Sequence, residues 1–201
     1  MTRLASEMTQ PAPTWARACG HFITITRHKQ EVMRLLFACG LPRQALLHDL
    51  SKYSPVEFLQ GARYYQGTRS PNAAEREFKG FSDAWLHHKG RNKHHFEYWI
   101  DVPGKDGALM SPSPMPTRYI VEMLCDRIAA CKIYQGDAYT TQSPLEYFLL
   151  RETSGAMHPD TAAFLVVLLS MLAEKGEEET LRFVREQVVA KRFAVGEYGR
   201  F

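Results

Sequence analysis

Apolar residues recur every three or four positions along most of this 201-residue chain, which is the spacing of one face of an α-helix. The pattern is clearest over about 15–39 and 117–135, and in two consecutive stretches, 158–176 and 177–189, that predict a closing helical pair. No segment shows the alternating pattern of a β-strand, and no repeat of solenoid length occurs. The pattern therefore predicts an all-α, single-domain helical bundle.

Glycine, proline and capping residues divide the rest of the chain into shorter elements. Ser54-Pro55-Val56-Glu57 has the form of a capping box with proline at the first helical position. Ser82 and Asn92 can act as N-caps of later helical turns. The short helices expected from these signals lie at about 43–49, 55–66, 82–88, 92–100 and 145–151.

The ends of the chain and one internal segment lack the helical pattern. Residues 1–14 are polar and contain two prolines, which predicts a flexible N-terminal lead-in to a domain over 15–192. Residues 193–201 are expected to form a C-terminal tail. The four prolines and two glycines of 101–116 predict a long loop, long enough to border an active site.

Composition narrows the class of protein. Hydrophobic residues make up 45% and charged residues 23%, as in ordinary soluble globular proteins, and a net charge of +3 is too small for the basic face of a nucleic-acid-binding protein. The four cysteines form no CxxC pair, and the longest apolar run, 162–173, is too short to span a bilayer. We expect a cytoplasmic protein with no nucleic-acid or membrane partner. The apolar run at 165–172 either completes the core or forms a homodimer face.

Two of the long helices place a polar side chain on an apolar stripe. The first stripe consists of His21, Ile25, His28, Val32 and Leu35, and the second of Tyr119, Met123, Asp126, Ala130 and Ile133. A histidine or aspartate facing a core is costly unless it is paired, hydrogen-bonded or bound to a cation. His28 and Asp126 are therefore candidate ligands.

Between these helices the chain reads LLHDLSKYS at 46–54, with His48 and Asp49 adjacent. The pair has two interpretations, a hydrogen bond at a helix end or a metal-binding element. Taken singly, each of these polar residues fits a structural role, because buried polar groups usually find partners within the protein. Taken together, on separate helices, they favour a metal site.

The segment AWLHHKGRNKHHFEYW at 84–99 adds two pairs of histidines. In the first pair, His88 shares a helical face with apolar neighbours and is preferred over His87. In the second pair, His95 is preferred over His94 for the same reason. The uncertain register of these short helical turns leaves both alternatives open.

The candidate metal ligands are thus His28, His48, Asp49, His88, His95 and Asp126. Imidazole nitrogen and carboxylate oxygen together suit Mn, Fe, Co, Ni or Zn better than Ca or Mg. Six such groups are too many for one tetrahedral zinc with an open position, but they fit two adjacent ions bridged by Asp49. The expected cofactor is one or two divalent transition-metal ions.

The order His28, His48-Asp49, Asp126 resembles the H…HD…D signature of the HD-domain metal-dependent phosphohydrolase superfamily. The resemblance implies an HD-type helical bundle in which these four residues hold the leading metal ion. HDLSK also resembles the HD-x-G-K form of the cyclic-di-nucleotide phosphodiesterase branch, which implies that Lys52 helps to hold phosphate. At closer range, HDLSKYSPVEF, AWLHHKGRNKHHFEYW and MHPDT resemble a bacterial family of unknown function over roughly residues 20–175.

The expected activity is hydrolysis of a phosphate ester, in a nucleotide or another small phosphorylated metabolite, by metal-activated water. Asp49 would act as ligand and bridge, while Lys52, Arg91 and Lys93 would bind and neutralise the phosphate oxygens. The same ligand order matches HD-type di-iron oxygenases. A non-catalytic helical domain that senses a nucleotide is a third alternative. No Walker-type or GxGxxG loop is present, which disfavours P-loop and dinucleotide chemistry.

Overall fold

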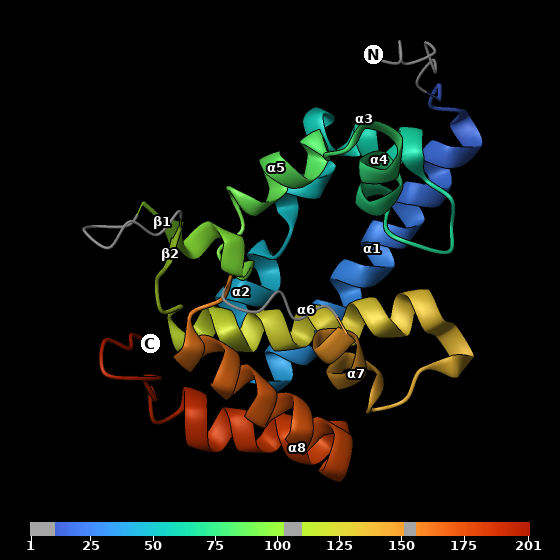
Figure 1. Cartoon of the computed structure of the whole chain (residues 1–201). Coiled ribbons are helices and arrows are strands. Elements are labelled where there is room, and N and C mark those ends of the chain that lie inside the picture. The colour runs from blue at the N-terminus through green and yellow to red at the C-terminus, as the bar shows by residue number, and fades with distance from the viewer. Residues whose placement is uncertain (1–10, 103–109, 151–155) are drawn as a thin grey trace.

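Two long helices cross at the centre of the fold, α1 (Trp15–Ala38) and α6 (Thr117–Gln135), and the other helices pack around them (Figure 1). This computed structural model describes residues 11–102, 110–150 and 156–201. The remaining helices in chain order are α2 (Pro42–Leu47), η1 (Leu50–Tyr53), α3 (Pro55–Tyr64), α4 (Pro71–Lys79), α5 (Asp83–Lys89), η2 (Phe96–Trp99), η3 (Gly136–Ala138), α7 (Ser143–Leu150), α8 (Pro159–Phe183) and η4 (Val184–Val189).

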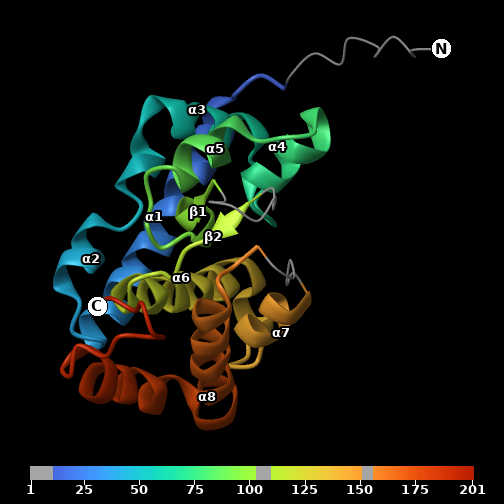
Figure 2. The same cartoon turned by 60° about the vertical axis from the view of Figure 1, so that its left-hand side comes forward.

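The main core lies where α1, α6 and α8 meet (Figure 2). Its fully buried aliphatic side chains include Leu35, Leu36, Leu124, Ile128 and Leu168. Burying each such side chain stabilises the fold by about 1.5–3 kcal/mol. The predicted all-α, single-domain fold is confirmed, because the only strands among the described residues are two-residue segments.

The predicted closing helical pair is present, and it is divided at Gly176 (Figures 1 and 2). Gly176 has φ 82° and ψ 176°, a backbone conformation that is nearly exclusive to glycine. The apolar run predicted to complete the core or form a dimer face contributes Leu165, Leu168, Leu169 and Leu172 to the core. This face of α8 is therefore occupied within the chain.

Substituting Gly176 by Ala is expected to lower the free energy of unfolding by about 1–3 kcal/mol, because a Cβ atom disfavours this conformation. Gly90→Ala is the matched control, since Gly90 has right-handed helical angles and should be neutral or stabilise by under about 1 kcal/mol. Urea denaturation followed by circular dichroism measures both. Equal effects of the two substitutions would contradict the prediction.

A second layer, formed by α3, α4 and α5, packs against the N-terminal part of α1 (Figure 1). Helix α4 was not predicted, because its sequence PNAAEREFK carries only a short apolar face, formed by Pro71, Ala74 and Phe78, among charged residues. Its buried Glu75 accepts a hydrogen bond from Ser82 Oγ (2.5 Å) and pairs with Lys79 Nζ (2.7 Å). These polar contacts add to the apolar ones of the helix, in which Phe78 packs against Tyr64 (5.9 Å between ring centroids).

The predicted serine caps are confirmed. Ser54 Oγ accepts a hydrogen bond from the backbone N–H of Glu57 (3.5 Å), and Ser82 Oγ accepts one from that of Trp85 (3.0 Å). The helix predicted to run to about 66 ends at Tyr64, and α7 begins two residues before its predicted start.

The prediction that Asn92 is an N-cap is wrong. Its side-chain amide donates to the backbone oxygen of His88 (2.8 Å) and to Ser51 Oγ (2.8 Å). The chain continues in turns, and helical structure resumes only with η2. Asn92 therefore ties the end of α5 to η1, which joins the two histidine-bearing segments.

The predicted loop at 101–116 includes a short antiparallel pair formed by β1 (Ile100–Asp101) and β2 (Ser111–Pro112). Its residues 103–109 lie outside the described part of the chain, as do 1–10 of the predicted lead-in and residue 151 of the predicted helix at 145–151.

The C-terminal residues 193–201 lie against the domain. The backbone N–H of Thr117 donates to the carbonyl oxygen of Arg200 (2.7 Å), and Val195 is buried. None of the helices described is both long and apolar enough to cross a membrane.

Candidate metal centre

His48 and Asp49 lie in the connection between α2 and η1. His48 ends α2, and Asp49 follows with φ 54° and ψ 25°. The left-handed conformation is uncommon for a residue other than glycine, and where it occurs the surrounding structure holds it in place. Both side chains are about 1% exposed, so the turn directs the imidazole and the carboxylate into the protein interior.

Four residues from three segments form what we term the first ligand group. It consists of His28 on α1, His48 and Asp49 in the turn, and Asp126 on α6. The potential ligand atoms all lie within 4.8 Å of one another. Nε2 of His28 is 2.9 Å from Asp126 Oδ1, and Nε2 of His48 is 3.2 Å from Asp49 Oδ2. The polar residues of the two helical stripes, His28 and Asp126, thus lie together beside His48 and Asp49.

The second ligand group consists of Asp49, His88, His94 and His95, with the same spacing limit. Nε2 of His88 and of His94 lie 3.3 and 3.4 Å from Asp49 Oδ1. Asp49 therefore presents one carboxylate oxygen to each group. The carboxylate that the sequence predicted as a bridge is the residue that the two groups share.

The choice between adjacent histidines has a different outcome in the two pairs. His88 belongs to the second ligand group, whereas His87 lies beside it and contacts Glu57. His94, which the sequence argument ranked below His95, is also in the group and is only 1% exposed. The turns before η2 do not follow helical periodicity, so both neighbours can point inward.

Two buried glutamates that were not predicted as site residues hold the imidazoles. Glu122 Oε1 accepts from Nδ1 of His48 (2.9 Å) and lies 3.2 Å from Nδ1 of His94. Glu57 Oε2 accepts from Nδ1 of His88 (2.7 Å). Carboxylates at Nδ1 are typical partners of metal-ligating histidines, because they leave Nε2 unprotonated for the ion.

Sequence signals existed for both glutamates. Glu122 precedes Asp126 by one helical turn and so shares its face. Glu57 was assigned to a capping box, and that prediction is wrong for its carboxylate. Its backbone N–H is capped, but its side chain is directed to His88 and His87 instead of back to the N-cap. Of the two hydrogen bonds expected in a capping box, only the one from the backbone N–H of Glu57 to Ser54 Oγ is formed.

Burial and neighbouring charges shift the pKa values of the groups in this cluster. Burial raises the pKa of Asp49, but the positive charges at His48, Lys52 and His88 outweigh it, so its pKa is well below the usual range. Burial, then repulsion from His94 and His88, holds the pKa of His95 well below its usual range. An ionised Asp49 and a neutral His95 are the forms that coordinate metals. Burial lowers the pKa of His48 and of His88, but the charge of Asp49 outweighs it and raises both, so these two rings would have to release a proton to bind an ion.

Several of these ligand atoms make no hydrogen bond with any described residue, although they are fully buried. They are Nε2 of His48, His94 and His95, and Oδ1 of Asp49, whereas Asp49 Oδ2 is paired with Lys52 Nζ (2.5 Å). Buried polar atoms without partners are rare and costly. Their convergence on two adjacent points fits cations as the missing partners, and the nitrogen and oxygen donor set fits transition metals.

The three predicted phosphate-binding residues occupy different surroundings. Lys52 Nζ lies 2.5 Å from Asp49 Oδ2 and lines a cavity of about 820 Å³. Arg91 and Lys93 are exposed and lie outside the lining of this cavity. Lys93 instead lies over the ring of Tyr98 (5.7 Å). The structure thus brings Lys52 to the ligand groups and leaves the other two at the surface.

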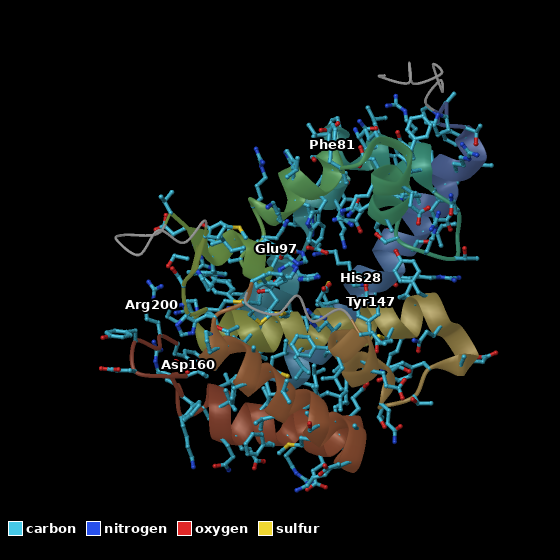
Figure 3. All side chains as sticks on the ribbon, in the orientation of Figure 1. His28, Phe81, Glu97, Tyr147, Asp160 and Arg200 are labelled. Atoms are coloured by element: carbon cyan, nitrogen blue, oxygen red, sulfur yellow. The ribbon has the colours of Figure 1, made fainter. Side chains whose placement is uncertain are left out.

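The cavity adjoins both ligand groups and has a largely apolar wall. Among its lining residues are His28, Glu97 and Tyr147, which come from α1, η2 and α7 (Figure 3). Its volume is within the range of pockets that bind small molecules. The stripe containing Met123, Asp126, Ala130 and Ile133 faces it, which explains why α6 carries an inward carboxylate.

His21 is buried on the same face of α1 as the candidate ligand His28. The effect of this burial on stability can be measured. Burial, with a smaller contribution from the charge of Lys52, lowers the pKa of His21 to about 4. The unfolded chain binds this proton near pH 6.5, so stability is full above that value and is lost as the pH falls toward 4.

We expect the metal-free protein to lose roughly 3 kcal/mol more than a His21→Gln variant over that pH interval. Urea unfolding at several pH values measures this difference, since groups common to both proteins cancel. Parallel pH profiles for the two proteins would show that His21 is not held neutral.

A family model matches residues 17–171, and it describes a family of unknown function, DUF5662. The match covers most of the chain, including both ligand groups, so the chain belongs to this family. No curated protein and no solved structure matches the chain.

Proposed function

We propose that this member of the DUF5662 family is a metal-dependent phosphohydrolase acting on a nucleotide or another small phosphorylated metabolite. One observation carries the proposal: two buried ligand groups share Asp49 and present unpartnered lone pairs beside a cavity lined by Lys52. The resemblance of the H…HD…D order to the HD-domain superfamily supports the same reading, and remains a prediction.

The donor set suits two divalent transition-metal ions, such as Mn, Fe, Co, Ni or Zn. His28, His48, Asp49 and Asp126 would hold one ion, and Asp49, His88, His94 and His95 the other. When bound, such ions act as Lewis acids and shift the pKa of water toward neutrality. Glu122 and Glu57 would keep the imidazoles oriented by accepting hydrogen bonds from their Nδ1–H groups.

Lys52 is the residue proposed to contact the phosphate. Its side chain is 27% exposed on the cavity side, and its ammonium group neutralises Asp49 when no other cation does so. A cation in this position can bind a phosphate oxygen as charge develops during cleavage. No serine or cysteine in the described part of the cavity lining stands beside an activating base arranged for covalent catalysis, so direct attack by water is the simplest mechanism.

The proposal is tested by elemental analysis of protein purified without an immobilised-metal column, combined with assays on 4-nitrophenyl phosphate and bis(4-nitrophenyl) phosphate. We expect about two transition-metal ions per chain and metal-dependent release of 4-nitrophenol. Two iron ions without hydrolysis would favour the oxygenase alternative. A chain that binds no metal even after incubation with Mn and Fe would overturn the proposal and make LLHDLSKYS a structural turn.

A further inference from the structure

Beyond the ligand groups, the cavity lining includes a guanidinium group to which the proposed hydrolysis assigns no role. Arg127 follows Asp126 on α6 and lines the cavity together with Met123 and Phe148. Its Nη2 is 3.8 Å from Met123 Sδ, and its guanidinium carbon lies 5.1 Å from the centre of the Phe148 ring. Both neighbours are apolar.

Arg127 lacks an anionic partner in the part of the chain that is described. No carboxylate there lies within ion-pair distance of its guanidinium, and its Nε is fully buried without a hydrogen bond. Glu97 lines the same cavity but forms no ion pair with it. A partly buried cation without a carboxylate counter-ion is costly, so a ligand anion would relieve a penalty that the protein carries.

Arg69 shows how another cavity arginine is neutralised. Its Nη1 and Nη2 lie 2.5 and 2.6 Å from the two carboxylate oxygens of Glu77, a paired arrangement that leaves no charge to be satisfied. A third arginine of the lining, Arg76, lies over the ring of Trp85 (5.3 Å). Unlike Arg69, Arg127 has apolar neighbours and no described carboxylate within ion-pair distance. The contrast separates a structural ion pair from a residue available to a ligand.

We propose that the substrate carries a second anionic group, a carboxylate or a second phosphate, which Arg127 binds while the reacting phosphate lies at the metal centre. The inference rests on the proposed function for the position of the reacting phosphate. Adjacent Cα atoms on a helix are about 3.8 Å apart and their side chains diverge by about 100°, which places the two anions roughly 6–10 Å apart.

The rest of the lining indicates what joins the two anionic groups. Ile25, Ala130, Ile133 and Phe148 provide apolar contacts around this part of the cavity. A compact apolar or aromatic linker would therefore be bound in preference to a strongly hydrated one. The substrate class is a small phosphate ester with an anion at the opposite end of an apolar body.

The test compares two phosphonates that cannot be hydrolysed as esters, benzylphosphonate and 4-(phosphonomethyl)benzoate, by titration calorimetry on metal-loaded protein. Wild type should bind the carboxylated probe roughly tenfold to a hundredfold more tightly, the range expected for a charge-assisted hydrogen bond. In Arg127→Met the ratio of the two affinities should fall to about one. Arg127→Lys should retain part of the preference, because it keeps the charge.

Arg69→Met is the matched control and should keep the wild-type ratio. A ratio near one in the wild type, a preference that survives in Arg127→Met, or no binding of the carboxylated probe would each overturn the inference. Thermal melting confirms that the variants fold. Because the readout is binding, it is separate from the hydrolysis assay: a preference without any turnover would reject the hydrolase and retain the role of Arg127.

Discussion

Replacing Asp49 by Asn is expected to reduce the bound metal from about two ions per chain to at most one. Each carboxylate oxygen of Asp49 faces a different ligand group, and among the described residues only Asp49 is a member of both. An amide keeps the shape of the side chain but offers only one neutral oxygen. Hydrolysis of 4-nitrophenyl phosphate should fall by about a thousandfold or more, since the ions supply several kcal/mol of charge stabilisation.

Elemental analysis and steady-state kinetics measure the two effects on the same preparation. Asp137→Asn on the exposed η3 segment is the control for the loss of one carboxylate, and it should leave both values unchanged. An Asp49→Asn protein that keeps two ions and full activity would reject Asp49 as the shared ligand.

Glu122→Ala is expected to weaken the binding of both metal ions by about 10–100-fold. Glu122 contacts Nδ1 of His48, in the first ligand group, and of His94, in the second. Without the carboxylate, these rings lose the acceptor that sets their tautomer and orientation. Glu57→Ala should weaken mainly one ion, because Glu57 contacts only His88 among the ligands.

Competition with a chromogenic chelator measures the affinity for each ion. It therefore distinguishes weaker binding of both ions from weaker binding of one. Glu146→Ala provides the control, since Glu146 is exposed on α7 and distant in the chain from both groups. If Glu122→Ala and Glu57→Ala affected the same single ion, the assignment of Glu122 to both groups would be wrong.

The residues that sequence periodicity placed correctly lie on regular helices. On α1, His21, Ile25, His28, Val32 and Leu35 are all buried, as the three- and four-residue steps predicted. Periodicity succeeds there because every position of a long helix has a defined direction relative to the core. The same three- and four-residue spacing predicted that Asp126 faces inward, and it lines the cavity from α6.

Periodicity failed where backbone geometry is irregular or where polar contacts stabilise the element. The choice of His95 over His94 assumed a helix, but the chain there forms turns, and both rings enter the site. Helix α4 was missed because its apolar face is short, formed by Pro71, Ala74 and Phe78, and the buried Glu75 interrupts it. The inward direction of His94 is not encoded in spacing alone.

By itself, the sequence determined the all-α class, the serine caps and most of the ligand-type residues, including Asp49 as the shared one, because these depend on local periodicity and residue chemistry. Only the tertiary structure decided that His94 belongs to the second ligand group, that Glu122 and Glu57 hold the imidazoles, and that Arg127 lines the cavity with no described carboxylate within ion-pair distance. Such relations join residues up to 98 positions apart, as between His28 and Asp126. They arise from how whole helices pack, which spacing along one chain does not specify.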